Sequence, residues 1–407
     1  MKLKHILILG AGIYQVPLIR RAVDSGYNVT VASYGDNYPG MKIAHNTWKV
    51  DTRDRETLLN LAKKNKIDAV ITTGTDVAIP TVGYICDHLG LPGVSFRSAE
   101  IMANKHLFRD FLRKKQLPHP NYVVGEEFID VKDKLKSLKL PIIFKPVDTS
   151  GSRGLGVIKK YNSVNAYEKF KYAKGFSRSG LVCAEEFIDG IEVGGDGILH
   201  DSQFIFISIT HKHCKDFVVT GHSLPTNISA KDQERVRYAL EKCCGAIAYK
   251  RGPLNFDVMV TSEQIIILEM SARNGGNGIP AVIKRATGID VEEATLQMAM
   301  GKQEMHIGSN LKKRSCGSLI FGSEYPGIFH GVTNIESLQT KIPEVFDMVV
   351  AIEKGQKIKR FNHNGNMIGY ILFDCPEPTG YEEIAGCIRS SICLKILPGE
   401  DFDDQPD

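Results

Sequence analysis

The sequence lacks the features that would mark a membrane, secreted or disulfide-rich protein. No stretch approaches ~18 consecutive apolar residues, so we expect no membrane span. The apolar run at residues 6–9 is too short for a signal-peptide core. The nine cysteines include the adjacent pair Cys243 and Cys244 but no C-x-x-C motif. An odd, unpatterned count favours reduced thiols in a cytoplasmic protein.

Charge of one sign is also scarce. The 51 basic and 47 acidic residues nearly balance, leaving a formal net charge of +4. Such a weak and dispersed excess argues against nucleic acid as a partner. The hydrophobic fraction of 43% is ordinary for a globular protein, and the length predicts about two to four domains. We expect disorder only in the acidic tail, residues 400–407.

Strands and helices alternate through the first hundred residues. Apolar runs predict strands at 6–9, 27–32 and 69–72, and amphipathic patterns predict helices at 54–64 and 77–89. This alternation is typical of a parallel sheet covered on both faces.

The rest of the chain mixes its elements. A helical pattern at 98–116 ends before Pro118. Further elements are expected at 140–145, 181–188, 194–199, 204–210, 255–260 and 265–270 (strands) and at 232–249 (a helix). This order predicts an α+β arrangement with antiparallel strands. From about residue 308 the chain looks β-rich, with a turn at 362–365.

The glycine turn Gly10-Ala11-Gly12 after the first strand has three interpretations. A dinucleotide fingerprint requires a third glycine where this chain has Gln15, and an acidic residue that comes only at Asp36. A glycine turn that opens a helix can equally hold a substrate anion on backbone N–H groups. It can also be merely a tight turn. The two departures favour substrate contact or structure over dinucleotide binding.

A second glycine-rich segment, residues 150–156, follows the predicted strand that ends at Lys145. The lysine can place its ammonium on a phosphate, and Ser150, Gly151, Ser152 and Gly154 let backbone N–H groups approach phosphoryl oxygens. The lysine precedes the glycines, which excludes a Walker A loop. Taken alone, the segment fits a surface turn equally well.

Two carboxylates interrupt apolar strands farther along the chain. Asp257 and Glu269 would each cost several kcal/mol (roughly) if buried without a partner or a metal. Two carboxylates on neighbouring strands suit Mg²⁺ bridged to substrate phosphates. A single carboxylate at such a position would be explained more simply as facing solvent. The segment 271–276 that follows contains Arg273 and a glycine turn, which can stabilise charge on a transferring phosphoryl group.

The order of these motifs resembles that of the ATP-grasp superfamily. The matching elements are, in chain order, Lys105 with Arg109, Lys145 with its glycine loop, Glu185 to Glu192, Asp257, and Glu269 to Arg273. Each motif is loose, but five in order are specific. The resemblance spans nearly the whole chain, including terminal domains like those of biotin-carboxylase-type members.

The resemblance implies three domains. They are a Rossmann-like α/β domain at 1–98, an ATP-grasp domain at 99–307 and a β-rich domain at 308–407. Within the second domain, a mobile lid is expected at about 121–187.

The resemblance also implies a role for each matching residue. Lys105 and Lys145 contact the ATP phosphates, and residues 150–156 form a flap over them. The adenine-facing hinge is formed, mainly through backbone groups, by Glu185, Glu186, Phe187 and Ile188. Glu192 contacts the ribose, and Asp257 and Glu269 are the metal ligands. Mg²⁺ is the expected metal, with Mn²⁺ as an alternative. Arg273 stabilises the acyl phosphate and the transition state, beside Gly275 and Gly276 on the substrate side.

One position departs from the family pattern. Where the family often has asparagine two residues after the second metal carboxylate, this chain has Ser271. A hydroxyl reaches a metal less readily than an amide oxygen. Ser271, Asn274 or a water molecule is therefore the candidate third ligand.

The substrate side resembles bacterial L-amino-acid ligases at residues 219–225 and 354–372. Within the first segment, His222 can orient a substrate carboxylate or shuttle a proton, and a capped loop histidine fits equally well. His211, His213 and Cys214 lie close together in sequence, but the absence of a nearby fourth ligand argues against a zinc site.

We therefore expect an ATP-grasp ligase that joins a small carboxylate to a small amine through an acyl phosphate and releases ADP and phosphate. The alternatives are a carboxylase that uses bicarbonate as the acid, a dinucleotide-dependent oxidoreductase, and a nucleotide-binding regulatory protein without turnover. A cytoplasmic homodimer is the default expectation.

Overall fold

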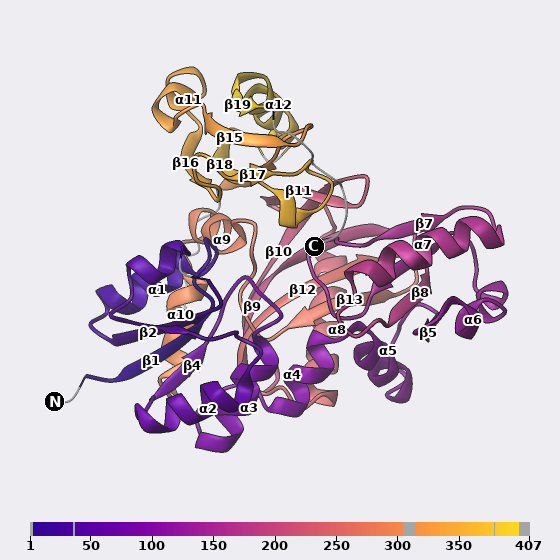
Figure 1. The fold of residues 1–407 in the computed structure, drawn as a ribbon, viewed down its shortest axis with the longest axis horizontal. Helices are drawn as coiled ribbons and strands as arrows, with labels where there is room; N and C mark the ends of the chain where they lie inside the picture. The colour runs from indigo at the N-terminus through magenta and orange to yellow at the C-terminus, as the bar shows by residue number, and fades with distance from the viewer. Residues whose placement is uncertain (1–2, 36, 304–313, 378, 399–407) are drawn as a thin grey trace.

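The computed structural model describes residues 3–35, 37–303, 314–377 and 379–398. Figure 1 shows three parts: a body that holds the N-terminal and central strands, an arm around α7, and an upper lobe formed by the last part of the chain. The predicted disordered tail at 400–407 and the predicted domain boundary at 307/308 lie outside the described residues. Within the described residues, every helix is too short or too polar to cross a membrane.

The N-terminal sheet is parallel, as predicted. Its strands have the order β3-β2-β1-β4 and are β1 (His5–Leu9), β2 (Asn28–Ser33), β3 (Asn46–Lys49) and β4 (Ala69–Ile71). The helices are α1 (Val16–Asp24), η1 (Pro39–Lys42), α2 (Arg55–Lys64) and α3 (Ile79–Leu89).

Both faces of the sheet are buried because β1 is apolar at every position after His5. Ile6 and Ile8 pack in a cluster with α1 and with α10 (Val291–Ala299), whereas Leu7 and Leu9 pack in a cluster with α2 and α3. Successive side chains of a strand point to opposite faces, so each pair covers one face.

The helical pattern predicted at 98–116 is two helices rather than one. They are α4 (Phe96–Ala103) and α5 (Lys105–Lys114). Asn104 has extended backbone angles, and its side chain accepts a hydrogen bond from the Leu107 N–H, so it caps α5. This break sets Lys105 at the first position of a new helix.

The arm corresponds to the segment expected to act as a lid. It is an antiparallel sheet of order β5-β8-β6-β7, built from β5 (Tyr122–Gly125), β6 (Ile142–Pro146), β7 (Gly156–Ile158) and β8 (Val182–Glu186). The helical elements are α6 (Phe128–Val131), η2 (Lys134–Ser137) and α7 (Ser163–Phe176). The arm has its own apolar cluster, in which Phe170 of α7 packs against Ile142 and Phe144 of β6. Its movement stays a prediction.

The central sheet is antiparallel, and the last part of the chain extends it. Its order is β13-β12-β9-β10-β11-β14-β18-β16. The strands are β9 (Ile191–His200), β10 (Gln203–Lys215), β11 (Val218–Leu224), β12 (Gly252–Val260), β13 (Ile265–Ser271), β14 (Ser315–Phe321), β16 (Val345–Val350) and β18 (Gly369–Cys375). The helices α8 (Ala230–Ala246) and α9 (Ile279–Thr287) accompany it. β11 pairs with β14, so one sheet continues across the predicted second and third domains.

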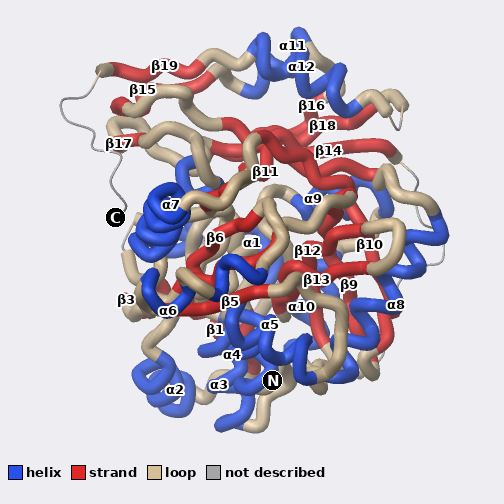
Figure 2. The backbone as a smooth tube through the Cα atoms, turned by 90° about the vertical axis from the view of Figure 1, so that its right-hand side faces the viewer, coloured by secondary structure: helices blue, strands red, loops and turns tan. Residues whose placement is uncertain are grey.

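The upper lobe adds a small antiparallel sheet, seen at the top of Figure 2. Its strands have the order β17-β15-β19 and are β15 (Gly327–Val332), β17 (Lys357–Ile358) and β19 (Leu394–Leu397). The remaining elements are α11 (Ile335–Lys341), η3 (Asn364–Asn366) and α12 (Tyr381–Ser391). The β-rich character expected after residue 308 is confirmed, with α11 and α12 in addition.

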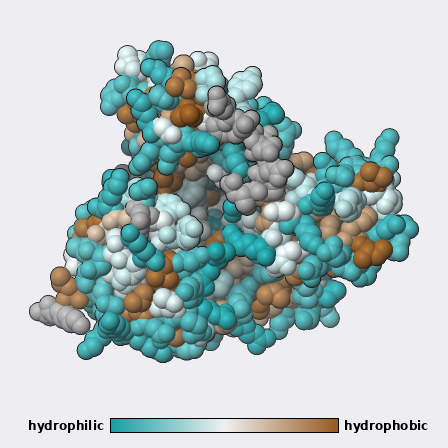
Figure 3. Space-filling model, viewed as in Figure 1, coloured by the Kyte–Doolittle hydropathy of each residue, from teal (hydrophilic) through white to brown (hydrophobic). Residues whose placement is uncertain are grey.

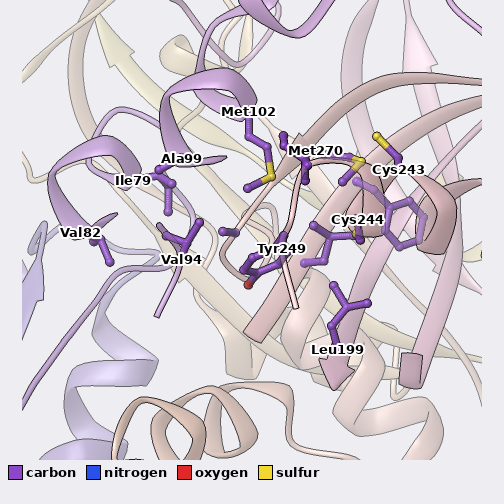
Figure 4. Close-up of a cluster of buried hydrophobic side chains, with 14 of the residues drawn as sticks. Ile79, Val82, Val94, Ala99, Met102, Leu199, Cys243, Cys244, Tyr249 and Met270 are labelled. Atoms are coloured by element: carbon purple, nitrogen blue, oxygen red, sulfur yellow. The ribbon is translucent and has the colours of Figure 1, made fainter. Parts of the chain in front are cut away.

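One apolar cluster joins the N-terminal part to the central sheet. Figure 4 shows side chains of α3, α4, α8 and β13 converging, among them Val82, Met102, Cys243 and Met270. Full burial of each large apolar side chain stabilises the fold by about 1.5–3 kcal/mol. The N-terminal sheet and the central sheet therefore share a core, whereas the arm has its own.

Candidate active site

A cavity of about 420 Å³ lies where the arm, the central sheet and the N-terminal part meet. Figure 3 shows that the surface is hollowed between the upper lobe and the body. Most of the residues predicted for the site line this cavity. They are Lys105, Lys145, Ser150, Gly151, Ser152, Glu185, Glu186, Phe187, Ile188, Glu192, His222, Asp257, Glu269, Arg273 and Gly276. Gly154, Ser271 and Gly275 do not line it.

The two predicted metal ligands face each other across neighbouring strands. Asp257 of β12 and Glu269 of β13 are direct partners in the antiparallel register, which is interrupted by a bulge immediately after Asp257. Withdrawal from water raises the pKa of Asp257, Lys212 lowers it, and the nearby carboxylates Glu192 and Glu269 raise it. Like charges placed opposite each other destabilise a sheet unless a cation offsets them.

Lysines supply that cation in this structure. The Lys212 Nζ donates to Asp257 Oδ2 at 2.9 Å and to Glu192 Oε1 at 2.6 Å. The Lys105 Nζ lies 3.8 Å from Glu269 Oε2 and donates to the Thr149 carbonyl at 2.6 Å. The pair of opposed carboxylates therefore has cationic neighbours on both sides.

The donor set fits Mg²⁺ shared with a nucleotide. Hard cations of this kind take oxygen ligands, and Mg²⁺ commonly binds one or two carboxylates together with phosphates and water. Among the described residues, no group of three or more His, Cys, Asp or Glu side chains is arranged to hold a metal. None of His211, His213 and Cys214 belongs to such a group. The protein would therefore contribute two carboxylates and leave the other ligands to phosphate and water.

Lys212 was missed by sequence reasoning. It lies on β10 between two histidines, and its side chain is only 8% exposed. Burial alone would lower the pKa of Lys212, but Asp257 and Glu192 hold it well above its usual value. Strand alternation places Lys212 on the same face as Thr210, whose hydroxyl contacts His222. This alternation could have indicated Lys212 as a site residue, but only if the face of β10 that points into the cavity had been known.

A buried charge cluster fixes the end of β6. The Glu185 carboxylate accepts from Arg109 Nε at 2.9 Å and contacts the Lys145 ammonium. Burial would raise the pKa of Glu185, but Arg109 and Lys145 outweigh it and lower the pKa to about 2. The Glu185 side chain thus anchors Lys145 at the mouth of the glycine-rich loop.

The glycine-rich loop at 150–156 covers the cavity, and its glycines are needed for two different reasons. Gly151 and Gly154 both have positive φ, +73° and +72°, which L side chains rarely adopt. A Cβ on Gly154 would also lie 2.8 Å from the Phe176 Cβ. Gly154 therefore packs the loop against α7, which explains why it does not line the cavity.

Arg273 is held by a residue from the N-terminal part. Its Nε donates to Asp76 Oδ1 at 2.9 Å, and its Nη1 donates to Asn255 Oδ1 at 2.8 Å. Burial would raise the pKa of Asp76, but Arg273 and the Ser271 hydroxyl outweigh it and lower the pKa. Ser271 thus donates to Asp76 and stands outside the cavity lining. Asp76 also lines the cavity, and sequence reasoning missed it.

The two glycines of the turn after Arg273 have different roles. The Gly275 N–H donates to both oxygens of Asp196 at 2.9 Å, so Gly275 holds the turn on β9 and does not line the cavity. Gly276 lines the cavity beside the Tyr14 ring. The Asn274 side-chain oxygen accepts from Thr295, and Asn274 is fully buried away from the cavity lining.

The His222 ring is buried in the cavity wall. It is 2% exposed, and its Nδ1 lies 3.0 Å from Thr210 Oγ1. Burial, followed by the nearby Lys212, holds the pKa of His222 well below its usual value. A neutral imidazole can orient a substrate by hydrogen bonding, but it offers no positive charge to a carboxylate.

The turn at Gly10–Gly12 is filled by a side chain. Gln15 Oε1 accepts from the Gly12 N–H at 2.9 Å, and its Nε2 donates to the Thr73 carbonyl. A Cβ on Gly10 would meet the Gln15 side chain at 3.1 Å. The backbone donor that a pyrophosphate would need is therefore engaged, which argues against dinucleotide binding. Asp36 lies outside the described residues.

Part of the chain matches a known protein family. Residues 138–281 match the family model described as an ATP-grasp domain. The chain contains an ATP-grasp domain. The matched range includes Lys145, the glycine-rich loop, Glu185, both opposed carboxylates and Arg273, so the cavity residues fall largely within the ATP-grasp domain.

Three similar proteins extend the comparison beyond the matched range. An uncharacterized protein, y4rH of Sinorhizobium fredii, is 27% identical over 88% of this chain and 75% of its own length. The solved L-amino acid ligase from Bacillus licheniformis has a TM-score of 0.84 at 19% identity, covering 98% of this chain and 100% of that one. A biotin carboxylase domain from Hydrogenobacter thermophilus, a dimer solved with MgADP and bicarbonate, has a TM-score of 0.74 at 14% identity, covering 97% and 91%. The fold of the whole chain is thus that of the L-amino acid ligase and of the biotin carboxylase domain.

Proposed function

We propose that this protein is an ATP- and Mg²⁺-dependent carboxylate–amine ligase. It would form an amide or peptide bond through an acyl phosphate and release ADP and phosphate. The observation that carries the proposal is one cavity that unites the opposed carboxylates Asp257 and Glu269 with Lys145 and Arg273. A cavity that contains metal-binding carboxylate oxygens as well as several fixed cations suits a nucleoside triphosphate and its metal.

The charges of the cavity support a polyphosphate as occupant. Lys105, Lys145 and Lys212 bring three ammonium groups to the cavity, each beside a carboxylate. Asp257 and Glu269 would hold Mg²⁺, which when bound supplies Lewis-acid stabilisation of phosphoryl charge. The lysines would then neutralise the negative phosphate charge that Mg²⁺ does not. Catalysis of this kind depends on positioning and electrostatics, and no side-chain nucleophile is required.

The reaction would proceed in two transfers. A substrate carboxylate oxygen attacks the γ-phosphorus of ATP, the bond to the β,γ-bridging oxygen breaks, and ADP leaves with the electron pair. The amine nitrogen then attacks the acyl carbon, the carbon–oxygen bond to phosphate breaks, and the nitrogen loses a proton to phosphate or water. Arg273 would stabilise the negative oxygens in both transfers, because Asp76 and Asn255 already hold its guanidinium in place.

We further propose amino acids as the substrate class, on the fold likeness to the L-amino acid ligase and the sequence resemblance at 219–225. All nine cysteines are free, which supports a reducing, cytoplasmic setting. A homodimer is proposed by analogy with the dimeric biotin carboxylase domain.

The decisive experiment measures phosphate release from ATP and Mg²⁺ across pools of amino acids, other carboxylic acids and amines, with and without bicarbonate. Release that requires both an organic acid and an amine supports the ligase. Release with bicarbonate alone moves the assignment to a carboxylase, the alternative that the biotin carboxylase likeness favours. ATP binding with no release in any pool contradicts both and favours a regulatory protein.

A further inference from the structure

A second cavity, of about 240 Å³, lies between the N-terminal sheet and the start of β12. It shares no lining residue with the candidate active site. Its wall comes from β4, α3, the segment before α4, the segment between α8 and β12, and α10. The lining residues include Val82, Val94, Tyr249, Arg251, Ala272 and Thr295.

The wall of this second cavity is mostly apolar. Val82, Val94 and Tyr249, all labelled in Figure 4, come from three separate segments and contribute to it. The volume exceeds the roughly 150 Å³ of an engineered apolar cavity that binds benzene, and it is below the roughly 300 Å³ of drug-sized sites. A small molecule with an apolar body therefore fits by size and by chemistry.

Arg251 provides the polar end of the cavity. Its Nη2 donates to the Gln303 carbonyl at 3.2 Å, and its other terminal contacts are to the Lys302 carbonyl and the Gln303 side chain. All of these partners are uncharged. Within the described residues, the buried Nε has no hydrogen-bond partner, and no carboxylate forms an ion pair with Arg251. Buried donors in native proteins normally have partners, so an unpaired one beside a cavity points to a missing acceptor.

We propose that this second cavity is a binding site for a small monocarboxylate with an apolar body. The carboxylate would accept from the Arg251 Nε, the donor without a partner, and the guanidinium charge would strengthen that hydrogen bond. Of the described residues that line the cavity, none is acidic, so an ammonium group would find no counter-charge. The site therefore prefers a simple or 2-oxo acid to the α-amino acid with the same carbon skeleton.

The location of the site connects it to Arg273. Ala272 lines the second cavity and directly precedes Arg273 in the chain. Thr295 also lines it and donates to the Asn274 side-chain oxygen at 2.7 Å. An occupant would thus touch Ala272 directly and Asn274 through Thr295, and its binding would restrain the segment 271–274, which contains Arg273.

Titration calorimetry on the full chain tests the site with 4-methylpentanoate as the probe. Leucine has the same branched body with an added ammonium, and 4-methylpentanamide has it without the charge. We expect 4-methylpentanoate to bind and both comparators to bind at least tenfold more weakly. Arg251→Met should weaken 4-methylpentanoate at least tenfold, whereas Arg20→Met, the same change on the exposed face of α1, should leave it unchanged.

Hydrogen exchange with the wild-type chain provides a readout that needs no variant. We expect 4-methylpentanoate to slow amide exchange in residues 271–274 at least threefold. No binding at millimolar probe, equal binding of leucine, or a change of less than twofold in Arg251→Met would each overturn the proposal. Binding without slower exchange in 271–274 would overturn the connection to Arg273.

Discussion

Asp257 and Glu269 face each other with Lys212 and Lys105 beside them, and this arrangement makes each carboxylate testable. We predict that Glu269→Gln lowers ATP turnover roughly a hundredfold or more, because a Lewis acid contributes several kcal/mol and each 1.4 kcal/mol is tenfold in rate. The melting temperature should change little, since the amide is isosteric. Glu263→Gln, on the exposed turn between β12 and β13, is the matched control. Turnover that survives in Glu269→Gln would remove the metal assignment.

Asp196 is a second residue with a measurable signature. Burial raises its pKa to about 6, although Gly275 and Asn255 donate to it. The folded state therefore holds this proton more tightly than the unfolded state, and stability falls as pH rises from about 4 to about 6. By linkage the loss is on the order of 3 kcal/mol. We predict that Asp196→Asn removes this loss from the pH dependence of urea-unfolding stability. Asp201→Asn, at an exposed turn, should keep the wild-type slope; an unchanged slope in Asp196→Asn would contradict the assignment.

At the scale of elements, the glycine-rich loop is held down by the turn that contains η3. The Asn364 N–H donates to the Gly151 carbonyl at 3.0 Å, and its side chain donates to the Val219 carbonyl of β11 at 2.9 Å. The turn thus ties the arm to the central sheet. Closure over the cavity would depend on this contact, because the arm packs around its own apolar cluster and is not part of the shared core.

We predict that Asn364→Ala loosens the glycine-rich loop. Trypsin should cleave after Arg153 about fivefold faster, because one hydrogen bond contributes roughly 1 kcal/mol to holding the turn. The KM for ATP should rise by a similar factor. Asn366→Ala changes the same turn without touching the loop, since its side-chain amide donates to the Arg360 carbonyl and to Asn362 Oδ1. Equal cleavage rates in the two variants would contradict a holding role for Asn364.

At the scale of the whole molecule, the contact between Asp76 and Arg273 joins the N-terminal part to the candidate active site. Both side chains are buried, and the carboxylate is the acidic partner of the guanidinium. Removing one member of a buried pair leaves an uncompensated charge, which costs about 3–5 kcal/mol.

We predict that Asp76→Ala lowers the stability of the chain by about 3 kcal/mol and also lowers ATP turnover, because Arg273 loses the partner that orients it. Denaturant unfolding and phosphate release measure the two effects. Asp24→Asn, at the exposed end of α1, should change neither. Full turnover in a folded Asp76→Ala protein would show that Arg273 is held well enough by Asn255 alone.

The sequence by itself determined the periodic and local features of this protein. Alternation of apolar runs with amphipathic stretches gave the parallel N-terminal sheet, and the order of motifs indicated the ATP-grasp domain. Residues such as Lys145, Asp257 and Glu269 stood out because charges at strand ends or inside apolar strands need a reason. These signals lie within short stretches of chain, where spacing alone carries the information.

Only the tertiary structure decided which distant residues meet. Asp76 reaches Arg273 across nearly two hundred residues, and Lys212 faces Asp257 only because β9 lies between β10 and β12. Gly275 and Ser271 contact Asp196 and Asp76, respectively, and do not line the cavity, which the sequence alone did not indicate. The physical reason is that alternation along a strand assigns each side chain to one of two faces, but it does not say which face points into the molecule. That choice depends on sheet order, which is set by packing over the whole molecule.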